Sequence, residues 1–265
     1  MEATIDFKGK QIHYTISGQG KALVLLHGFL ESRLIWDNYS RALSDEFKVI
    51  CIDLPGFGKS DVFAETHSME FMAEAVRAVL DENRIDNCVI SGHSMGGYVA
   101  LAFADKYPEK TKGISLFHSH AAADNDEVKE NRERTIDIVK KGRKDFIHSF
   151  IPTLFAKENA EQFRDEIDAL RERHKYTSAE AIVAALRGMK ERRDHRELLR
   201  NAAFPIQFII GKKDEKIPFE NALSQAGLPD HSDIKLLGNV GHMGFIEAEQ
   251  ICLDSLRNFA EICYK

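Results

Sequence analysis

The chain has 265 residues, of which 43% are hydrophobic and 29% are charged, and its formal net charge is −6. This length and apolar content suit one α/β unit with a substantial core. The negative charge gives no electrostatic reason to expect nucleic acid as a partner. Nothing in the composition indicates an oligomeric state.

The sequence pattern predicts a cytoplasmic protein. The N-terminus has no basic segment followed by an apolar stretch, so we expect no secretory signal. The apolar runs are as long as strands and far too short for a membrane span. The four cysteines lie in apolar segments without a Cys-x-x-Cys pair, which indicates buried reduced thiols rather than a metal or redox motif.

Strand and helix patterns alternate along most of the chain. Residues 3–17 alternate polar and apolar side chains around Lys8-Gly9-Lys10, which predicts an antiparallel hairpin. Continuous apolar runs, typical of strands buried on both faces, follow at 22–26, 48–52, 87–91, 113–117, 206–210 and 233–237. Helical patterns lie between most of them, at 68–83, 95–106, 219–226 and 247–264. This alternation predicts a mostly parallel sheet with helices on both faces.

Residues 124–200 interrupt the alternation. They contain no strand pattern and are dense in charges of both signs. We expect them to form a helical cap inserted into a core made of residues 1–123 and 201–265. Two helix starts inside the cap have the spacing of a capping box, and they are Thr177 with Glu180 and Asp194 with Glu197.

The segment Gly92-His-Ser94-Met-Gly96 matches the G-x-S-x-G motif. It follows the apolar run at 87–91 and precedes the helical pattern at 95–106. A sharp strand-to-helix turn strains the serine backbone and leaves no room for side chains at the flanking positions, which glycine satisfies. The serine hydroxyl would then lie beside a helix N-terminus, where negative charge is favoured. Ser94 is therefore the candidate nucleophile, and the alternative is a serine N-cap between two loop glycines.

Acyl transfer needs two backbone N–H groups directed at the developing oxyanion. One is expected from Met95, directly after the nucleophile, and the other from Phe29 in a loop after an earlier strand. Gly28 lets the backbone approach closely, and His27 is expected to form hydrogen bonds within the loop.

A serine hydroxyl also needs an imidazole to accept its proton and a carboxylate to fix the imidazole. Asp214 follows the run at 206–210, and His242 lies on a glycine-flanked loop after the run at 233–237. This gives the order Ser, Asp, His that strand–turn–helix hydrolases use. Glu215 is the competing acid, and the register after the strand favours Asp214.

These motifs together resemble those of the α/β-hydrolase family of cap-bearing esterases, enol-lactonases and related enzymes. The matching segments are spread over nearly the whole chain, and they are His27-Gly28-Phe29, Asp53-Leu-Pro-Gly-Phe-Gly-Lys-Ser60, Gly92-His-Ser-Met-Gly-Gly97, Gly211-Lys-Lys-Asp214 and Gly241-His242. The resemblance implies the α/β-hydrolase fold with an eight-stranded sheet in which only the second strand is antiparallel. It also implies that the segment from Asp53 is a structural loop and not a phosphate cradle.

Three groups of side chains could shape the substrate site. His118 and His120 end the run at 113–117; a pocket-lining or structural role is favoured over metal binding, because no third ligand has diagnostic spacing. An apolar stripe in the cap, centred on Phe150 and Leu154, is the candidate face toward substrate. Four basic residues could attract an acidic substrate, although neighbouring acids favour a solvated mixed-charge face, and they are Arg187, Lys190, Arg192 and Arg193.

The expected activity is hydrolysis of carboxylic esters of a small molecule through an acyl-enzyme. Lactonase, thioesterase, carbon–carbon hydrolase and perhydrolase chemistry would use the same groups, and a small-molecule receptor that retains the fold is the alternative from another class. No metal and no organic cofactor is expected, because the protein supplies every group that the reaction needs.

Overall fold

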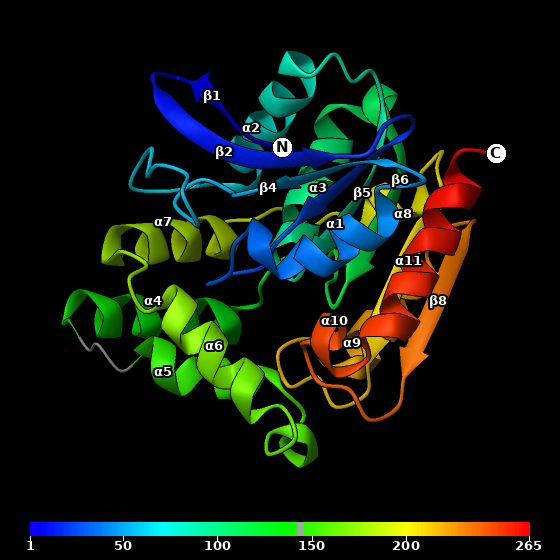
Figure 1. The fold of residues 1–265 in the computed structure, drawn as a ribbon. Helices are drawn as coiled ribbons and strands as arrows, with labels where there is room; N and C mark the ends of the chain where they lie inside the picture. Colours follow the sequence, from blue (N-terminus) through cyan, green and yellow to red (C-terminus); the bar gives the residue numbers. More distant parts are fainter. Residues whose placement is uncertain (143–145) are drawn as a thin grey trace.

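The structure is a computed structural model that describes residues 1–142 and 146–265 (Figure 1). Within these residues one sheet of eight strands has the order β1-β2-β4-β3-β5-β6-β7-β8. The strands are β1 (Glu2–Phe7), β2 (Lys10–Ser17), β3 (Ala22–Leu26), β4 (Lys48–Ile52), β5 (Cys88–His93), β6 (Thr111–Phe117), β7 (Ile206–Gly211) and β8 (Ser232–Leu237). Strand β2 is antiparallel to both of its neighbours and all other pairs are parallel, which confirms the expected sheet.

The predicted hairpin joins β1 to β2. Its two turn residues, Lys8 and Gly9, have φ values of 54° and 82°, as a tight turn between right-twisted strands requires. In the centre of the sheet, β3 and β5 are buried along their whole length. Parallel strands covered by helices on both faces have this uniform burial, which explains their continuous apolar runs.

Helices cover both faces of the sheet (Figure 1). The pair α2 (Met69–Glu82) and α3 (Met95–Lys106) packs on one face, and α1 (Asp37–Leu43) lies beside α11 (Glu249–Cys263) on the other. Helix α2 starts where the Ser68 side chain accepts a hydrogen bond from the Phe71 N–H, a favourable N-cap. Helix α3 is apolar almost all round, and ten of its twelve residues are buried.

Two helix starts differ from the prediction. The helix expected at 247–264 is α11, which starts two residues later, and a short helix that was not predicted, α10 (Gly244–Glu247), precedes it; Ala248 separates the two with a non-helical backbone at φ −144° and ψ 45°. The expected N-cap Thr177 is wrong by one residue. The Thr177 N–H closes the end of the preceding helix on the His174 carbonyl, and Ser178 caps α7 (Ala179–Lys190) instead.

Between β6 and β7 the described residues form only helices. They are α4 (Asp126–Lys140), α5 (Phe146–Phe150), α6 (Arg164–His174), α7 and α8 (Arg196–Arg200), with short 3₁₀ turns that include η3 (Ile151–Leu154) and η4 (Lys157–Asn159). Helices α4 to α7 gather beside one end of the sheet, at the lower left of Figure 1. Residues 143–145 of the expected cap lie outside the described residues, and the cap boundaries remain a prediction. The expected capping box at Asp194 is absent, because α8 starts after His195 and the Asp194 carboxylate accepts from the Arg196 N–H.

The loop after β4 is held together by hydrogen bonds to the carboxylate of Asp53, the first residue after the strand. The Asp53 carboxylate accepts hydrogen bonds from the backbone N–H groups of Arg33 at 2.8 Å and Lys59 at 3.0 Å. A Cβ at Gly58 would lie 2.2 Å from this carboxylate, so the loop requires glycine there. These bonds occupy the amides that a phosphate would need and support the structural role that the resemblance implies.

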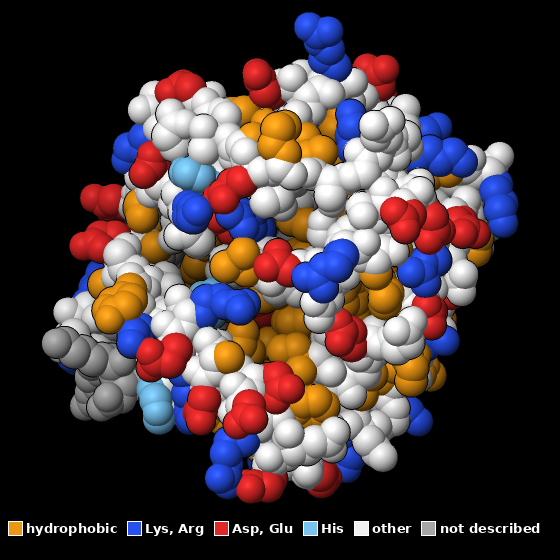
Figure 2. All heavy atoms as spheres, in the orientation of Figure 1, with side chains coloured by type: hydrophobic (Ala, Val, Ile, Leu, Met, Phe, Trp, Pro, Cys, Tyr) orange, Lys and Arg blue, Asp and Glu red, His pale blue; other side chains and the backbone are white. Residues whose placement is uncertain are grey.

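Acidic and basic side chains alternate over the face shown in Figure 2. Three of the four basic residues that could attract an acidic substrate pair with acidic side chains: Arg187 with Glu65, Lys190 with Glu133 and Arg193 with Glu70. The fourth, Arg192, is buried and does not belong to a solvated face. No helix of the described residues is long and apolar enough to cross a bilayer.

Candidate active site

Ser94 occupies the strained turn between β5 and α3. Its backbone has φ 49° and ψ −113°, a conformation that is costly for a residue with a side chain. A Cβ at Gly92 would lie 2.2 Å from the Gly96 carbonyl, and one at Gly96 would lie 2.5 Å from the Leu26 oxygen. The two flanking glycines therefore let the turn pack against its neighbours, as the motif predicts.

Asp214 and His242 meet at the ends of β7 and β8. The His242 Nδ1–H donates to Asp214 Oδ2 at 2.7 Å, and both side chains are buried. The other oxygen, Asp214 Oδ1, accepts from the N–H groups of Lys216 and Ile217 at 2.8 and 2.9 Å. Burial raises the pKa of Asp214, but the His242 charge and the hydrogen bonds from His118 and His242 outweigh burial and hold this pKa far below its usual value. Asp214 is therefore a carboxylate at neutral pH.

Glu215, the competing acid, has a different environment. Its carboxylate is exposed and pairs with the Lys157 ammonium at 2.7 Å. Among the described residues the acid that contacts His242 is Asp214. The register argument from the strand end thus selected the carboxylate that the structure brings to the histidine.

Ser94 and His242 line one cavity of about 360 Å³. Phe29, Phe150 and Leu154 also line it, so the cap contributes apolar surface to the cavity. No hydrogen bond joins the Ser94 hydroxyl to His242 in the part of the chain that the structure describes, a looseness that is common in ligand-free hydrolases. The cap also contacts the histidine loop directly, because the His242 N–H donates to the Leu154 carbonyl at 2.7 Å.

The expected oxyanion donors lie on two sides of Ser94. Met95 begins α3, so its N–H is at a helix N-terminus. Phe29 follows β3, and among described groups its N–H makes no intramolecular hydrogen bond. His27 fixes this loop as expected, since its Nε2 accepts from the Leu54 N–H at 3.0 Å.

A buried ion pair that sequence reasoning missed lies beneath the nucleophile turn. The His93 Nδ1–H donates to Glu31 Oε2 at 2.9 Å, and the same oxygen accepts from the Gly28 N–H at 2.5 Å. The His93 Nε2–H donates to the His242 carbonyl at 2.9 Å. Burial lowers the pKa of His93, but the charge and hydrogen bond of Glu31 outweigh burial and raise it above its usual value. This pair ties together the oxyanion loop, the nucleophile turn and the histidine loop.

His118 lies behind the acid. Its Nδ1–H donates to Asp214 Oδ2 at 3.3 Å, and burial lowers its pKa to about 4. The side chain is fully buried and is not part of the described cavity lining, unlike Phe150 and Leu154. His118, Asp214 and His242 have ligand atoms within 4.8 Å of one another, but Asp214 Oδ2 already accepts from both histidines. His120 points elsewhere, with Nε2 at 3.4 Å from Arg192.

Comparisons with known proteins agree on the fold. A model of the alpha/beta hydrolase fold family matches residues 21–132. A thermophilic esterase from Thermogutta terrifontis, solved with malate bound, is 29% identical over the full length of both chains with a TM-score of 0.93. An enol-lactonase from Burkholderia xenovorans LB400 has 20% identity and a TM-score of 0.89 over 97% of this chain and 99% of the other.

A relative from Paraburkholderia phymatum is named 2-hydroxy-6-oxononadienedioate/2-hydroxy-6-oxononatrienedioate hydrolase. It is 28% identical over 250 residues, which cover 88% of this chain and 84% of the relative. Sheet order, nucleophile turn and matched segments define an α/β hydrolase. The chain has the α/β-hydrolase fold and is an enzyme of the hydrolase class.

Proposed function

We propose that the protein hydrolyses carboxylic esters of small molecules, with Ser94 as nucleophile, His242 as general base and Asp214 as the acid that orients it. The observation that carries this proposal is the buried His242–Asp214 pair, whose histidine shares a cavity with a serine in a strained turn. The three residues follow the carboxyl ends of β5, β7 and β8, which lie at the same end of the sheet because these strands are parallel, with β6 between β5 and β7.

The reaction follows from these positions. The Ser94 oxygen attacks the acyl carbon while His242 Nε2 takes the proton of the Ser94 hydroxyl. Asp214 stabilises the imidazolium that forms. The N–H groups of Phe29 and Met95 hold the oxyanion, each contributing roughly 3 kcal/mol. The imidazolium then gives its proton to the departing alcohol. Water attacks the acyl-enzyme with His242 again as base, which releases the acid and restores Ser94.

Two relatives bear on the substrate. The Thermogutta terrifontis protein, called an esterase, is similar over the whole of this chain, which supports ester hydrolysis. The Paraburkholderia phymatum relative is named for hydrolysis of an oxo-dienedioate, so a carbon–carbon hydrolase is the second candidate. Both reactions use an activated serine or water at the same cavity.

A substrate panel separates these candidates. Purified protein is incubated with p-nitrophenyl esters of increasing acyl length, enol-lactones, acyl thioesters and a 2-hydroxy-6-oxo-dienoate, and the Ser94→Ala variant is the control. We expect turnover of short esters that Ser94→Ala loses by several orders of magnitude. Labelling by a fluorophosphonate probe reports the activated serine independently of substrate, and failure of both readouts would favour a receptor that retains the fold.

A further inference from the structure

Two cations lie where the cavity of Ser94 meets a second cavity. Six residues line both: Tyr98, Val128, Asn131, Arg132, Glu215 and Lys216. Arg132 comes from α4 of the expected cap, and Lys216 comes from the loop that carries Asp214. A substrate that extends from Ser94 toward the second cavity therefore passes between a guanidinium and an ammonium.

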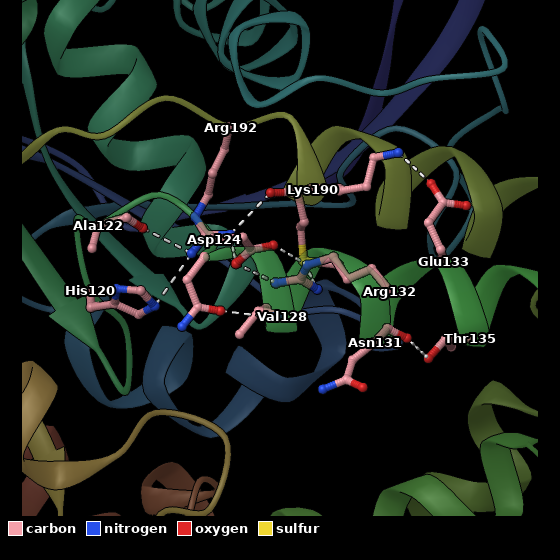
Figure 3. A network of polar contacts seen from close by, with 12 residues as sticks. His120, Ala122, Asp124, Val128, Asn131, Arg132, Glu133, Thr135, Lys190 and Arg192 are labelled. Carbon is pink, nitrogen blue, oxygen red and sulfur yellow. Dashed lines mark hydrogen bonds and ion pairs between the residues drawn. The ribbon is translucent and has the colours of Figure 1, made fainter.

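Arg132 belongs to a buried charge cluster that is not neutral (Figure 3). The Asp124 carboxylate accepts hydrogen bonds from both Arg132 and Arg192, and its side chain is 2% exposed. Burial lowers the pKa of the neighbouring His120 to about 4, with Arg192 acting in the same direction, so that imidazole carries no charge at neutral pH. Two guanidinium groups therefore share one carboxylate, which leaves one positive charge in excess.

The two arginines differ in how many of their N–H groups have hydrogen-bond partners. Arg192 also donates to the Met189 and Ala122 carbonyls at 3.0 and 2.9 Å, and its guanidinium lies 4.0 Å from the centre of the Tyr98 ring. Arg132 uses Nε and Nη2 on Asp124, and Nη1 has only the Met189 sulfur at 3.5 Å. Arg132 thus keeps N–H donors for a ligand while Asp124 holds its guanidinium in place, which lowers the entropy cost of binding.

Lys216 adds a second charge to the lining that the two cavities share. No carboxylate of residues 1–142 or 146–265 lies within ion-pair distance of its ammonium, which lies 5.1 Å from the centre of the Phe150 ring. The acidic residues of the described cavity lining have their own partners. Glu31 pairs with His93, and Glu215 pairs with Lys157. A chain of net charge −6 thus places along its reaction cavity a charge cluster with one positive charge in excess and a lysine that has no ion-pair partner among the described residues.

We propose that Arg132 and Lys216 bind a carboxylate of the substrate, so that the preferred ester is an anionic one such as the half-ester of a dicarboxylic acid. This inference rests on the proposed ester hydrolysis and adds the substrate class. Guanidinium and carboxylate form charge-assisted, bidentate hydrogen bonds, which supply both affinity and orientation. The carboxylate would lie at the junction of the two cavities while the ester carbonyl lies at Ser94.

The test compares matched charged and neutral esters. Monoethyl adipate and ethyl hexanoate differ mainly in the terminal carboxylate, and 4-acetoxybutanoate against butyl acetate places the charge on the alcohol side instead. We expect kcat/KM for at least one anionic ester to exceed that of its neutral partner about 10-fold or more, and 1 M NaCl to reduce this preference. If the acyl-side pair shows the preference, the substrate carboxylate lies on the acyl side of the ester; if the alcohol-side pair shows it, the carboxylate lies on the alcohol side.

Two variants assign the preference to these residues. Arg132→Met leaves Asp124 paired one to one with Arg192, so the buried cluster becomes neutral rather than broken, and Lys216→Gln removes the second cation. Each should lower kcat/KM for the anionic ester about 10-fold more than for the neutral ester. Arg187→Gln, on an exposed pair outside the cavity, is the matched control and should keep the preference.

Two results would overturn the proposal in distinguishable ways. If the enzyme hydrolyses neutral esters as well as anionic ones, or if the variants lower both equally, the anion site is wrong and ester hydrolysis stands. If neither ester is turned over and the fluorophosphonate does not label Ser94, ester hydrolysis itself is wrong and the anion site fails with it.

Discussion

Replacing Glu31 by glutamine tests the buried pair beneath the nucleophile turn. Glu31 Oε2 accepts from the Gly28 N–H and from His93, and the side chains of the pair are 3% and 0% exposed. A glutamine oxygen in the place of Oε2 can still accept both bonds, but the amide carries no charge, so the charge-assisted bond to His93 is weakened and the ion pair is lost. A buried His93 cation without its carboxylate partner would lower the unfolding free energy by about 3–5 kcal/mol, but burial favours the neutral imidazole, so His93 can release its proton. We therefore expect a loss of about 2–3 kcal/mol in unfolding free energy.

The loss should depend on pH in a defined way. The pKa of His93 is raised in the folded state, so its contribution is complete below the usual histidine value of 6.5 and is lost as the pH rises through the raised pKa. The pKa of Glu31 is lowered, because the His93 charge and hydrogen bonds outweigh burial, so its contribution is complete above the usual value of 4.5 and is lost as the pH falls through the lowered pKa. The difference between Glu31→Gln and the unmodified protein should be largest between about pH 4.5 and 6.5.

Thermal unfolding from pH 4 to 9 measures this difference. Near pH 6 the variant should melt about 4–12 °C lower. Glu46→Gln is the control, because Glu46 pairs with Arg257 at 3.1 Å on the surface, where such pairs contribute about 0–1 kcal/mol. If Glu31→Gln melts like the control, or if its deficit is constant over the whole pH range, the ion-pair reasoning is refuted.

The other predictions concern the reaction. Asp214→Asn should lower kcat about 10³–10⁴-fold with the fold intact, whereas Glu215→Gln should have a far smaller effect; the reverse order would reassign the acid. Phe150→Ala with Leu154→Ala should change the preference among acyl lengths more than the rate of fluorophosphonate labelling, and one common factor for all substrates and the probe would make these side chains structural packing. Activity should survive dialysis against EDTA, and a loss that a divalent ion restores would make His118 a candidate ligand.

Sequence patterns predicted the sheet well because buried strands have a continuous apolar signal. The run at 206–210, for example, is β7 with one residue added. Helix α1 was missed since only Tyr39 and Leu43 of its seven residues are buried, too few to form a periodic stripe. Helix α10 was missed because its four residues are too few to form a periodic stripe.

In the candidate site, too, some residues could be predicted from sequence patterns and others could not. Ser94, Asp214 and His242 could be predicted because each lies on a loop or turn shortly after a strand, and the sheet then brings these loops to one end. The ion pairs could not be predicted, because their partners are far apart in sequence. Glu31 and His93 are 62 residues apart, and Asp124 and Arg192 are 68 apart. In sequence these charges look like the solvated ones around them, and only tertiary packing makes them buried.

The Glu31–His93 pair and the cluster around Asp124 differ in net charge, and this difference bears on their roles. A buried charge is tolerated when an opposite charge and hydrogen bonds compensate it. Glu31 and His93 compensate each other, and the pair lies among the loops that carry the reacting groups, as a fixed support would. Asp124 compensates only one of its two arginines, and the excess lies with Arg132, the member that reaches the cavity. An anionic substrate would supply the missing negative charge, so binding and electrostatic compensation would occur together.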